Sequence, residues 1–274
     1  LPTASRGAAG TPAGIPQPAT SFVGRRSELR ELRRLLGEHR LVSVVGPGGM
    51  GKTRLALRAA DEFRREFPDG VRFVEFASVR SDTMLAQSLC DVLALENRDS
   101  HDLSAQDAVI EYLRHRRMLL ILDNCEHVVD GAAELVARLL EQTSGLRILV
   151  TSREYLAIPG EYVFHLASLP TDDEADSGAM ELFSRRAEAV LSGFGLDDTN
   201  RAAVRRICQR LDGLPLAIEL ACTRLAVLSV DDLADMLDRR LSLLSVNSRD
   251  RTPRHRSLQA TIDWSYELCS ETEQ

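Results

Sequence analysis

Lysine is nearly missing from this chain of 274 residues. Its 34 basic side chains are 33 arginines and one lysine, Lys52. Arginine serves ion pairs, helix surfaces and planar contacts with two hydrogen bonds, whereas lysine supplies a compact charge on a flexible stem. A guanine site of the N/T-K-x-D type needs a lysine of its own, and the residues around Lys52 do not match that pattern. This class of guanine recognition is therefore excluded.

Other absences restrict the class of protein further. The five cysteines are scattered without a C-x-x-C pair, which predicts small apolar core residues in a reducing cytoplasm rather than disulfides or metal ligands. They are Cys90, Cys125, Cys208, Cys222 and Cys269. The longest apolar strand-like run, Met118–Leu122, is too short to cross a membrane, and the N-terminus shows no signal-peptide pattern. We therefore expect a cytoplasmic protein with no membrane partner.

An excess of basic charge is also missing. The net charge is −7 and the pI is near 5.5. DNA-binding modules usually carry a basic stripe, and a negative field repels phosphates, so this chain is not expected to bind DNA by itself. The charge does not argue against one nucleotide held in a local pocket.

Composition and periodicity divide the chain into four parts. Residues 1–20 are rich in Ala, Gly, Pro and Thr and indicate a linker between domains. Residues 21–170 alternate between strand and helix patterns, residues 171–246 form consecutive helical patterns, and residues 247–274 begin with a polar linker. Both ends indicate a part of a longer protein, because the last amphipathic helix stops without a finished domain.

The alternation in residues 21–170 predicts an α/β fold. Strands are expected at Leu41–Val45, Val71–Phe76, Met118–Asp123, Leu146–Thr151 and Tyr162–Leu166. Helices are expected at Ser27–Glu38, after Lys52, and at Asp82–Leu95, Ser104–Arg116 and Gly131–Thr143. Strands that alternate with helices predict a parallel sheet covered on both faces. The helices expected next, at Ala179–Leu191, Asn200–Leu211, Leu214–Leu228 and Val230–Leu241, indicate a second, all-helical domain.

A glycine-rich loop follows the first strand and contains the lone lysine. It matches the phosphate-binding P-loop pattern G-x-x-x-x-G-K-[ST]. Its residues are Gly46, Pro47, Gly48, Gly49, Met50, Gly51, Lys52 and Thr53. The glycines let backbone N–H groups converge on phosphate oxygens, Lys52 reaches the β- and γ-phosphates, and Thr53 binds Mg²⁺. The alternative is a glycine-rich turn with a surface lysine.

Asp123 ends the apolar strand Met118–Asp123 at the carboxyl edge of the expected sheet, where P-loop proteins hold Mg²⁺. The alternative is a core strand followed by a capping Asp. Asn124 follows, at a point where many P-loop ATPases carry a second acid, and Asn cannot act as a base. Glu126 is the nearest substitute, although it could equally lie in the first turn of a loop or helix.

Arg153 ends the strand pattern Leu149–Arg153 and is predicted to lie beside the γ-phosphate, where a fork of donors can distinguish ATP from ADP. The alternative is an ordinary arginine at a strand end. Together, these elements predict four catalytic residues. They are Lys52, Asp123, Glu126 and Arg153.

With these elements in order, the chain resembles the STAND class of P-loop ATPases, which includes NB-ARC modules. Three more segments carry the resemblance: Ser21–Leu29 is similar to the entry motif near the adenine, Gly213–Ala217 to the G-x-P motif of the helical domain, and Ser257–Tyr266 to the opening of a winged-helix domain. The segment Leu120–His127 is similar in sequence to the corresponding segment of large bacterial regulators of the SARP and LuxR types. The preference for arginine suits an actinobacterial genome.

The resemblance implies ATP/ADP as the bound nucleotide, with Mg²⁺, between the α/β and helical domains. Its binding set adds the entry and G-x-P residues to the P-loop, Arg54 and Arg153. The added residues are Phe22, Val23, Arg25, Pro215 and Leu216. DNA is then contacted only through other domains of the full-length protein, and the ATP state can self-associate.

Three functional hypotheses follow. The leading one is an ATP/ADP switch with slow ATPase activity in a multidomain transcriptional regulator. The second is a turnover enzyme, either an oligomeric AAA-type motor or a P-loop kinase. The third is a scaffold that binds nucleotide without cleaving it, which Asn124 supports because the usual second acid is absent.

Overall fold

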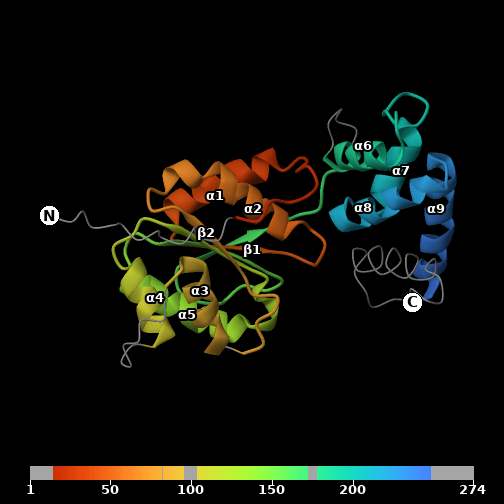
Figure 1. The fold of residues 1–274 in the computed structure, drawn as a ribbon. Coiled ribbons are helices and arrows are strands. Elements are labelled where there is room, and N and C mark those ends of the chain that lie inside the picture. The colour runs from red at the N-terminus through yellow and green to blue at the C-terminus, as the bar shows by residue number, and fades with distance from the viewer. Residues whose placement is uncertain (1–14, 82, 96–103, 172–177, 248–274) are drawn as a thin grey trace. The chain divides into compact units, whose positions relative to one another are not determined.

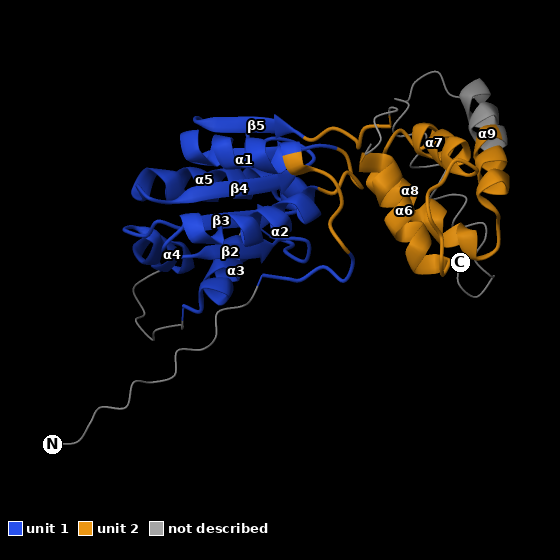
Figure 2. Ribbon diagram, turned by 90° about the horizontal axis from the view of Figure 1, so that it is seen from above, with its two compact units in different colours: residues 1–20, 27–46, 52–165 blue, residues 21–26, 47–51, 166–274 orange. Residues whose placement is uncertain are grey.

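The computed structural model describes residues 15–81, 83–95, 104–171 and 178–247. The chain divides into two compact units, which Figure 2 draws in different colours. Unit 1 comprises residues 1–20, 27–46 and 52–165, and unit 2 comprises residues 21–26, 47–51 and 166–274. Unit 1 contains a sheet with helices, and the described elements that lie wholly in unit 2 are helical. The domain limits expected from composition stay a prediction.

Unit 1 is built on one parallel sheet of five strands in the order β2-β3-β4-β1-β5. The strands are β1 (Leu41–Val45), β2 (Val71–Glu75), β3 (Leu119–Asp123), β4 (Arg147–Ser152) and β5 (Glu161–His165). Strand β4 lies between β1 and β3 and pairs in parallel with both. All five predicted strands are present, each displaced by at most one residue at either end, so the predicted α/β sheet is confirmed.

Helices cover both faces of this sheet. They are α1 (Arg26–Glu38), α2 (Lys52–Glu62), α3 (Thr83–Leu93), α4 (Ala105–Leu113) and α5 (Val129–Gln142). Helices α1 and α2 lie on one face and α3, α4 and α5 on the other (Figure 1). Strands β1 and β3 are buried at every position. This burial explains their continuous apolar runs, because a strand covered on both faces has no solvent side on which to alternate.

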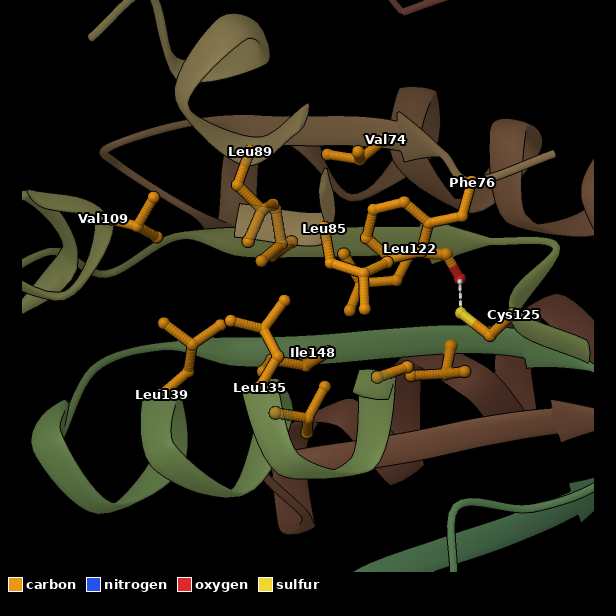
Figure 3. Close-up of a cluster of buried hydrophobic side chains, with 14 of the residues drawn as sticks. Val74, Phe76, Leu85, Leu89, Val109, Leu122, Cys125, Leu135, Leu139 and Ile148 are labelled. Carbon is orange, nitrogen blue, oxygen red and sulfur yellow. Dashed lines mark hydrogen bonds between the residues drawn. The ribbon is translucent and has the colours of Figure 1, made fainter. Parts of the chain in front are cut away.

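The core beneath α3, α4 and α5 is made of aliphatic side chains around one large aromatic ring (Figure 3). Leu122 of β3 and Ile148 of β4 point into it, and Leu135 of α5 covers them. Phe76, directly after β2, is fully buried in the same cluster. Burying a side chain of this kind contributes about 1.5–3 kcal/mol. Cys90 and Cys125 belong to this core as free thiols, as expected of small apolar residues.

Helix α3 ends earlier than its sequence pattern predicted. The pattern continues to Leu95, but the helix stops at Leu93 because Ala94 takes a left-handed backbone conformation with φ 52°. The N–H of Leu95 then donates to the carbonyl of Cys90 at 2.9 Å. This closure satisfies a carbonyl that the last helical turn leaves without a partner.

Unit 2 contains α6 (Gly178–Val190), α7 (Arg201–Arg210), α8 (Pro215–Thr223) and α9 (Val230–Asn247). The helix expected over Leu214–Leu228 ends at Thr223 and is followed by the short 3₁₀ segment Arg224–Ala226. Arg186 of α6 forms an ion pair with Glu219 of α8 at 3.0 Å. The predicted winged-helix opening, Ser257–Tyr266, and Cys269 lie outside the described residues. None of the described helices combines the length and apolar character needed to cross a membrane.

Candidate functional site

The lone lysine lies at the first position of α2, immediately after the glycine loop. Its side chain is only 9% exposed, and Lys52 Nζ donates to the carbonyl of Gly46 at 2.8 Å. The N–H of Gly46 donates to the carbonyl of Ser152 at 3.3 Å, which ties the start of the loop to the end of β4. Burial lowers the pKa of Lys52, and the charge of Glu126 acts in the opposite direction. A surface lysine on a glycine-rich turn is therefore the wrong interpretation.

The middle of the loop, residues 47–51, belongs to unit 2. Gly49 has φ +79°, a conformation that side chains rarely adopt, and a Cβ there would lie 3.0 Å from Cβ of Leu216. The carbonyl of Gly49 accepts a hydrogen bond from the N–H of Leu216 at 3.2 Å. The buried Arg25 donates to the carbonyl of Met50 at 3.2 Å. Within unit 2, the loop is thus bonded both to the entry motif and to α8.

Asp123 is held in a fixed orientation by two hydroxyl groups. The carboxylate is 1% exposed at the end of β3. Thr53 Oγ1 donates to Oδ2 at 3.0 Å, and Thr151 Oγ1 donates to Oδ1 at 2.5 Å. Burial raises the pKa of Asp123, and the hydrogen bonds from Thr151 and Thr53 offset part of that shift. The two hydroxyl groups therefore orient a buried carboxylate at the carboxyl end of β3.

The residues around Asp123 fit a magnesium ion. Mg²⁺ is usually bound through one or two carboxylates together with phosphate oxygens and water. Asp123 and Thr53 supply one carboxylate and one hydroxyl in contact with each other. Among the described residues, no group of three or more His, Cys, Asp or Glu could hold a metal ion by itself. Such a site therefore needs ligands from a bound phosphate.

Thr151 was not among the predicted site residues. Its hydroxyl donates to Asp123 and also accepts from the N–H of Asn124 at 3.1 Å. Its position follows from the sheet, since β4 pairs with β3 with Leu122 opposite Val150, which places Thr151 level with Asp123. The signal available in the sequence was a hydroxyl residue near the end of the strand pattern, but only the strand order identifies its partner.

Glu126 and Arg153, which were predicted separately, form an ion pair. Arg153 Nε lies 3.0 Å from Glu126 Oε1, with side chains 63% and 20% exposed respectively. Asn124 has a left-handed backbone conformation, with φ 62° and ψ 51°. Its amide nitrogen, oriented towards the carboxylate, lies 3.1 Å and 3.2 Å from the two oxygens of Glu126. Glu126 itself lies in the 3₁₀ turn Cys125–His127, directly after β3.

The G-x-P segment has a local structural role in unit 2. A Cβ on Gly213 would lie 2.0 Å from the carbonyl oxygen of Leu169, so no side chain fits there. The N–H of Leu169 donates to the carbonyl of Gly213 at 2.9 Å. Pro215 begins α8, a position that suits proline because the first helical N–H has no partner within the helix. Leu216 is partly exposed.

The remaining predicted binding residues have varied surroundings. Phe22 and Val23 are half-buried in unit 2, like Pro47 and Gly48. Arg54 of α2 donates to the carbonyl of Thr20 at 2.9 Å, within unit 1. The structure therefore brings five predicted residues together in unit 1. They are Lys52, Thr53, Asp123, Glu126 and Arg153.

Known proteins share both the sequence and the fold. A family model described as the NB-ARC domain matches residues 27–175, more than half of the chain. A Mycobacterium tuberculosis protein, named as a candidate HTH-type transcriptional regulator, is 41% identical over 243 residues. That match covers 89% of this chain and 27% of the relative. Regulatory protein AfsR of Streptomyces coelicolor is 32% identical over 232 residues, which covers 78% of this chain and 22% of the relative. The chain thus spans about a quarter of these relatives.

Solved structures support the same architecture. The Walker-type ATPase of Pyrococcus abyssi has a TM-score of 0.53 at 13% identity, with 92% of each chain covered. A Pyrococcus horikoshii STAND protein with a tetratricopeptide repeat sensor has a TM-score of 0.50 at 18% identity, with 94% of this chain and 44% of that chain covered. At these identities the likeness shows the fold alone. The resemblance inferred from the P-loop and the order of motifs is confirmed, and the chain belongs to the NB-ARC family.

Proposed function

We propose that this chain is the ATP/ADP-binding switch of a larger bacterial transcriptional regulator and that slow ATP hydrolysis resets it. The observation that carries the proposal is the group of Lys52, Thr53 and Asp123, in which the buried lone lysine lies near a buried carboxylate that accepts a hydrogen bond from Thr53. The regulator names of the relatives support the larger context. DNA binding would then reside in other parts of the full-length cytoplasmic protein.

Phosphate binding follows from the loop and its lysine. In the structure, Lys52 donates to the loop's own carbonyl at Gly46. A bound phosphate would replace that carbonyl, because it presents a full negative charge to the ammonium where the carbonyl presents only a dipole. Thr53 and Asp123 would hold Mg²⁺, which neutralises charge on the phosphate oxygens. The predicted contacts of Phe22 and Pro215 with the base belong to the same proposal.

Hydrolysis requires the ion pair between Glu126 and Arg153 to break. In the proposed reaction, a water molecule attacks the γ-phosphorus, the bond to the bridging oxygen breaks, ADP departs with that electron pair, and Glu126 accepts the water proton. In the structure the Glu126 carboxylate is held by Arg153, and the Asn124 amide, with its nitrogen turned towards the carboxylate, would add a second contact. The γ-phosphate offers Arg153 a more highly charged partner, so ATP would release the carboxylate while ADP would not. Slow turnover is expected, because the base must first exchange partners.

A switch also needs contacts that differ between the two nucleotides. Arg153 supplies one difference, since only ATP carries the γ-phosphate. The loop supplies a route to the helices, because the Gly49 carbonyl is bonded to Leu216 within unit 2. Movement of this loop on exchange of ATP for ADP would alter that bond. Self-association in the ATP state is the proposed output of the change.

Nucleotide binding by the purified chain tests the proposal. We expect ADP and ATP to bind, and Lys52→Ala to weaken both about 100-fold, since a hydrogen bond to a charged group contributes up to about 3 kcal/mol. Arg58→Ala is the matched control, because Arg58 lies on the same helix outside the loop and forms an exposed ion pair with Glu62. Isothermal titration measures both variants. Unchanged affinity in Lys52→Ala, or no affinity in the wild type, would contradict the proposal.

A scaffold that binds nucleotide without cleaving it is the second candidate. Asn124 favours it, because an amide stands where many P-loop ATPases carry the second acid. Single-turnover hydrolysis distinguishes the two candidates. The scaffold predicts no measurable product from bound ATP, whereas the switch predicts slow but complete conversion. Fast steady-state turnover by a preformed hexamer would instead support the motor hypothesis.

A further inference from the structure

Four strands of the sheet begin beside an arginine. Arg40 immediately precedes β1, Arg72 is the second residue of β2, Arg117 lies two residues before β3, and Arg147 is the first residue of β4. Because the strands are parallel, all four residues belong to one edge of the sheet, opposite the carboxyl ends where Gly46 and Asp123 lie. The strand order places them in the sequence Arg72, Arg117, Arg147 and Arg40 across unit 1. These four residues are called the amino-edge arginines below.

Within the described part of the chain, none of the amino-edge arginines forms an ion pair with a carboxylate. The guanidinium groups of Arg40, Arg72 and Arg147 donate instead to carbonyl oxygens. Arg40 bonds the carbonyl of Thr143 at 2.6 Å, Arg72 bonds that of Val71 at 3.1 Å, and Arg147 bonds that of Gly37 at 3.4 Å. Arg72 Nε is buried without a hydrogen-bond partner. Carbonyl partners satisfy donors but leave the positive charges unneutralised.

The nearby carboxylates are already engaged. Glu66 pairs with Arg33 at 2.9 Å. Asp69 accepts from the backbone N–H of Arg117 at 2.7 Å and lies 3.8 Å from Arg116. Repulsion is also evident between neighbours, since burial lowers the pKa of Arg40 and the charge of Arg147 lowers it further. In a chain with net charge −7, an excess of positive charge at one edge is a local feature that needs a counter-charge.

A pocket opens among these residues. Its volume is about 320 Å³, within the usual range for small-molecule sites. It is lined by Glu66, Phe67, Arg117, Ser144, Gly145 and Arg147. Its walls are anchored by backbone bonds, because the N–H of Asp69 donates to the carbonyl of Arg117 and the N–H of Arg147 donates to that of Met118. The two cations are therefore presented by fixed segments at the starts of β3 and β4.

We propose that this pocket is a second ligand site, which binds a small organic phosphate through Arg117 and Arg147. A phosphate monoester carries close to two negative charges at neutral pH, which matches the two guanidinium groups. Planar guanidinium groups bind phosphate through paired hydrogen bonds, and the Ser144 hydroxyl adds a donor. The ring of Phe67 provides an apolar wall for the organic part. This site lies beyond the proposed nucleotide function, because it shares no residue with the P-loop.

A nucleic-acid backbone is the less suitable occupant. Nucleic-acid sites are extended basic surfaces, whereas this pocket has the volume of one small molecule. The acidic chain as a whole would also repel a polyanion. A single phosphate that enters the pocket avoids most of this repulsion, because salt screens charges that are more than about 8 Å away.

Titration of the 274-residue chain with phenyl phosphate tests the site. Saturation with ADP and Mg²⁺ beforehand keeps the probe out of the P-loop. We expect one phenyl phosphate to bind per chain. Benzyl alcohol should show no binding, and inorganic phosphate should bind more weakly than phenyl phosphate. Arg117→Gln and Arg147→Gln should each weaken binding about tenfold, as loss of one charge-assisted contact predicts, and the double variant should abolish it. Arg138→Gln is the matched control, because this exposed arginine of α5 pairs with Asp107.

Three outcomes would overturn the proposal. The first is no binding of phenyl phosphate by the wild type, and the second is unchanged binding in the double variant. The third is duplex DNA that displaces the probe and itself depends on Arg117 and Arg147. If the chain fails to bind ADP, the titration is repeated with Lys52→Ala, whose P-loop lacks its lysine. Failure of the nucleotide proposal and failure of this one are therefore separable.

Discussion

The two ends of the sheet in unit 1 carry charge in opposite ways. At the carboxyl end, Asp123 is bonded to two hydroxyl groups and Glu126 to Arg153, so each carboxylate has a partner within the site. At the amino end, Arg117 and Arg147 have no carboxylate partner in the described residues. Both ends belong to the same strands, so the fold alone does not account for the difference.

If both proposed sites bind their ligands, this difference makes them two kinds of ligand site. A site with internal ion pairs must exchange partners when a phosphate arrives, which makes binding responsive to the number of phosphates. A site with unneutralised cations gains a counter-charge directly and has no internal pair to break. The contrast predicts that substitutions at the carboxyl end alter the hydrolysis rate, the stability or its dependence on pH, whereas substitutions at the amino end have little effect without a ligand.

Glu126→Gln should show the largest effect. A positioned general base contributes about 10²- to 10⁴-fold to a rate, so single-turnover ATP hydrolysis should fall by that factor. Nucleotide affinity should change little, because the amide keeps the shape of the side chain. Quantifying ADP formed from bound ATP measures the rate, and Glu134→Gln on the exposed face of α5 is the control. Equal rates in Glu126→Gln and the wild type would remove the base from the mechanism.

Thr151→Val should produce the next largest effect. The substitution keeps the shape of the side chain but removes the hydroxyl that bonds both Asp123 and the N–H of Asn124. Leaving buried polar groups without partners costs about 1–3 kcal/mol of unfolding free energy. Urea unfolding measures this loss. Thr223→Val, at an exposed hydroxyl on α8, should change the unfolding free energy by less than about 0.5 kcal/mol. Equal losses in the two variants would contradict a special role for Thr151.

Much of the fold could be predicted, because its signals are local. The continuous apolar runs of β1 and β3 follow from burial on both faces, and the P-loop is a contiguous segment with its own chemistry. Strand positions were accordingly predicted to within one residue. The end of α3 was missed, because the residue that takes the left-handed conformation there is Ala94, whereas the usual sequence signal is glycine or asparagine.

The site was only partly predictable, because its contacts depend on strand order. Asp123 and Arg153 were predicted from their places at the ends of strand patterns. Their partners were not, since Thr151 meets Asp123 only because β4 lies beside β3. The amino-edge arginines, Arg40, Arg72, Arg117 and Arg147, are dispersed over more than 100 residues and contain no motif. Only a parallel sheet assembles them at one edge.

Asp123→Asn should change how stability depends on pH. Burial raises the pKa of Asp123 in the folded state above its value in the unfolded chain. The Asp123 carboxyl group therefore makes its full contribution to the free energy of unfolding below the unfolded-state pKa. That contribution is lost as the pH rises through the folded-state pKa. Without nucleotide, Asp123→Asn should remove this loss and equal or exceed the wild type in stability at neutral pH. Thermal unfolding across the acidic range measures it, and a strongly destabilised variant would contradict the assignment.

Arg147→Ala should show the smallest effect, and its sign is informative. Without a ligand, the substitution removes a cation that repels Arg40 and gives up only a 3.4 Å bond to Gly37. Surface substitutions of this kind usually change the unfolding free energy by less than about 0.5 kcal/mol. We expect no loss in low salt, and a smaller gain in stability on adding salt than in the wild type, since salt screens the repulsion that the variant lacks. Urea unfolding at two chloride concentrations measures both quantities. A clear loss in low salt would mean that Arg147 supports the fold, and the contrast between the two ends of the sheet would disappear.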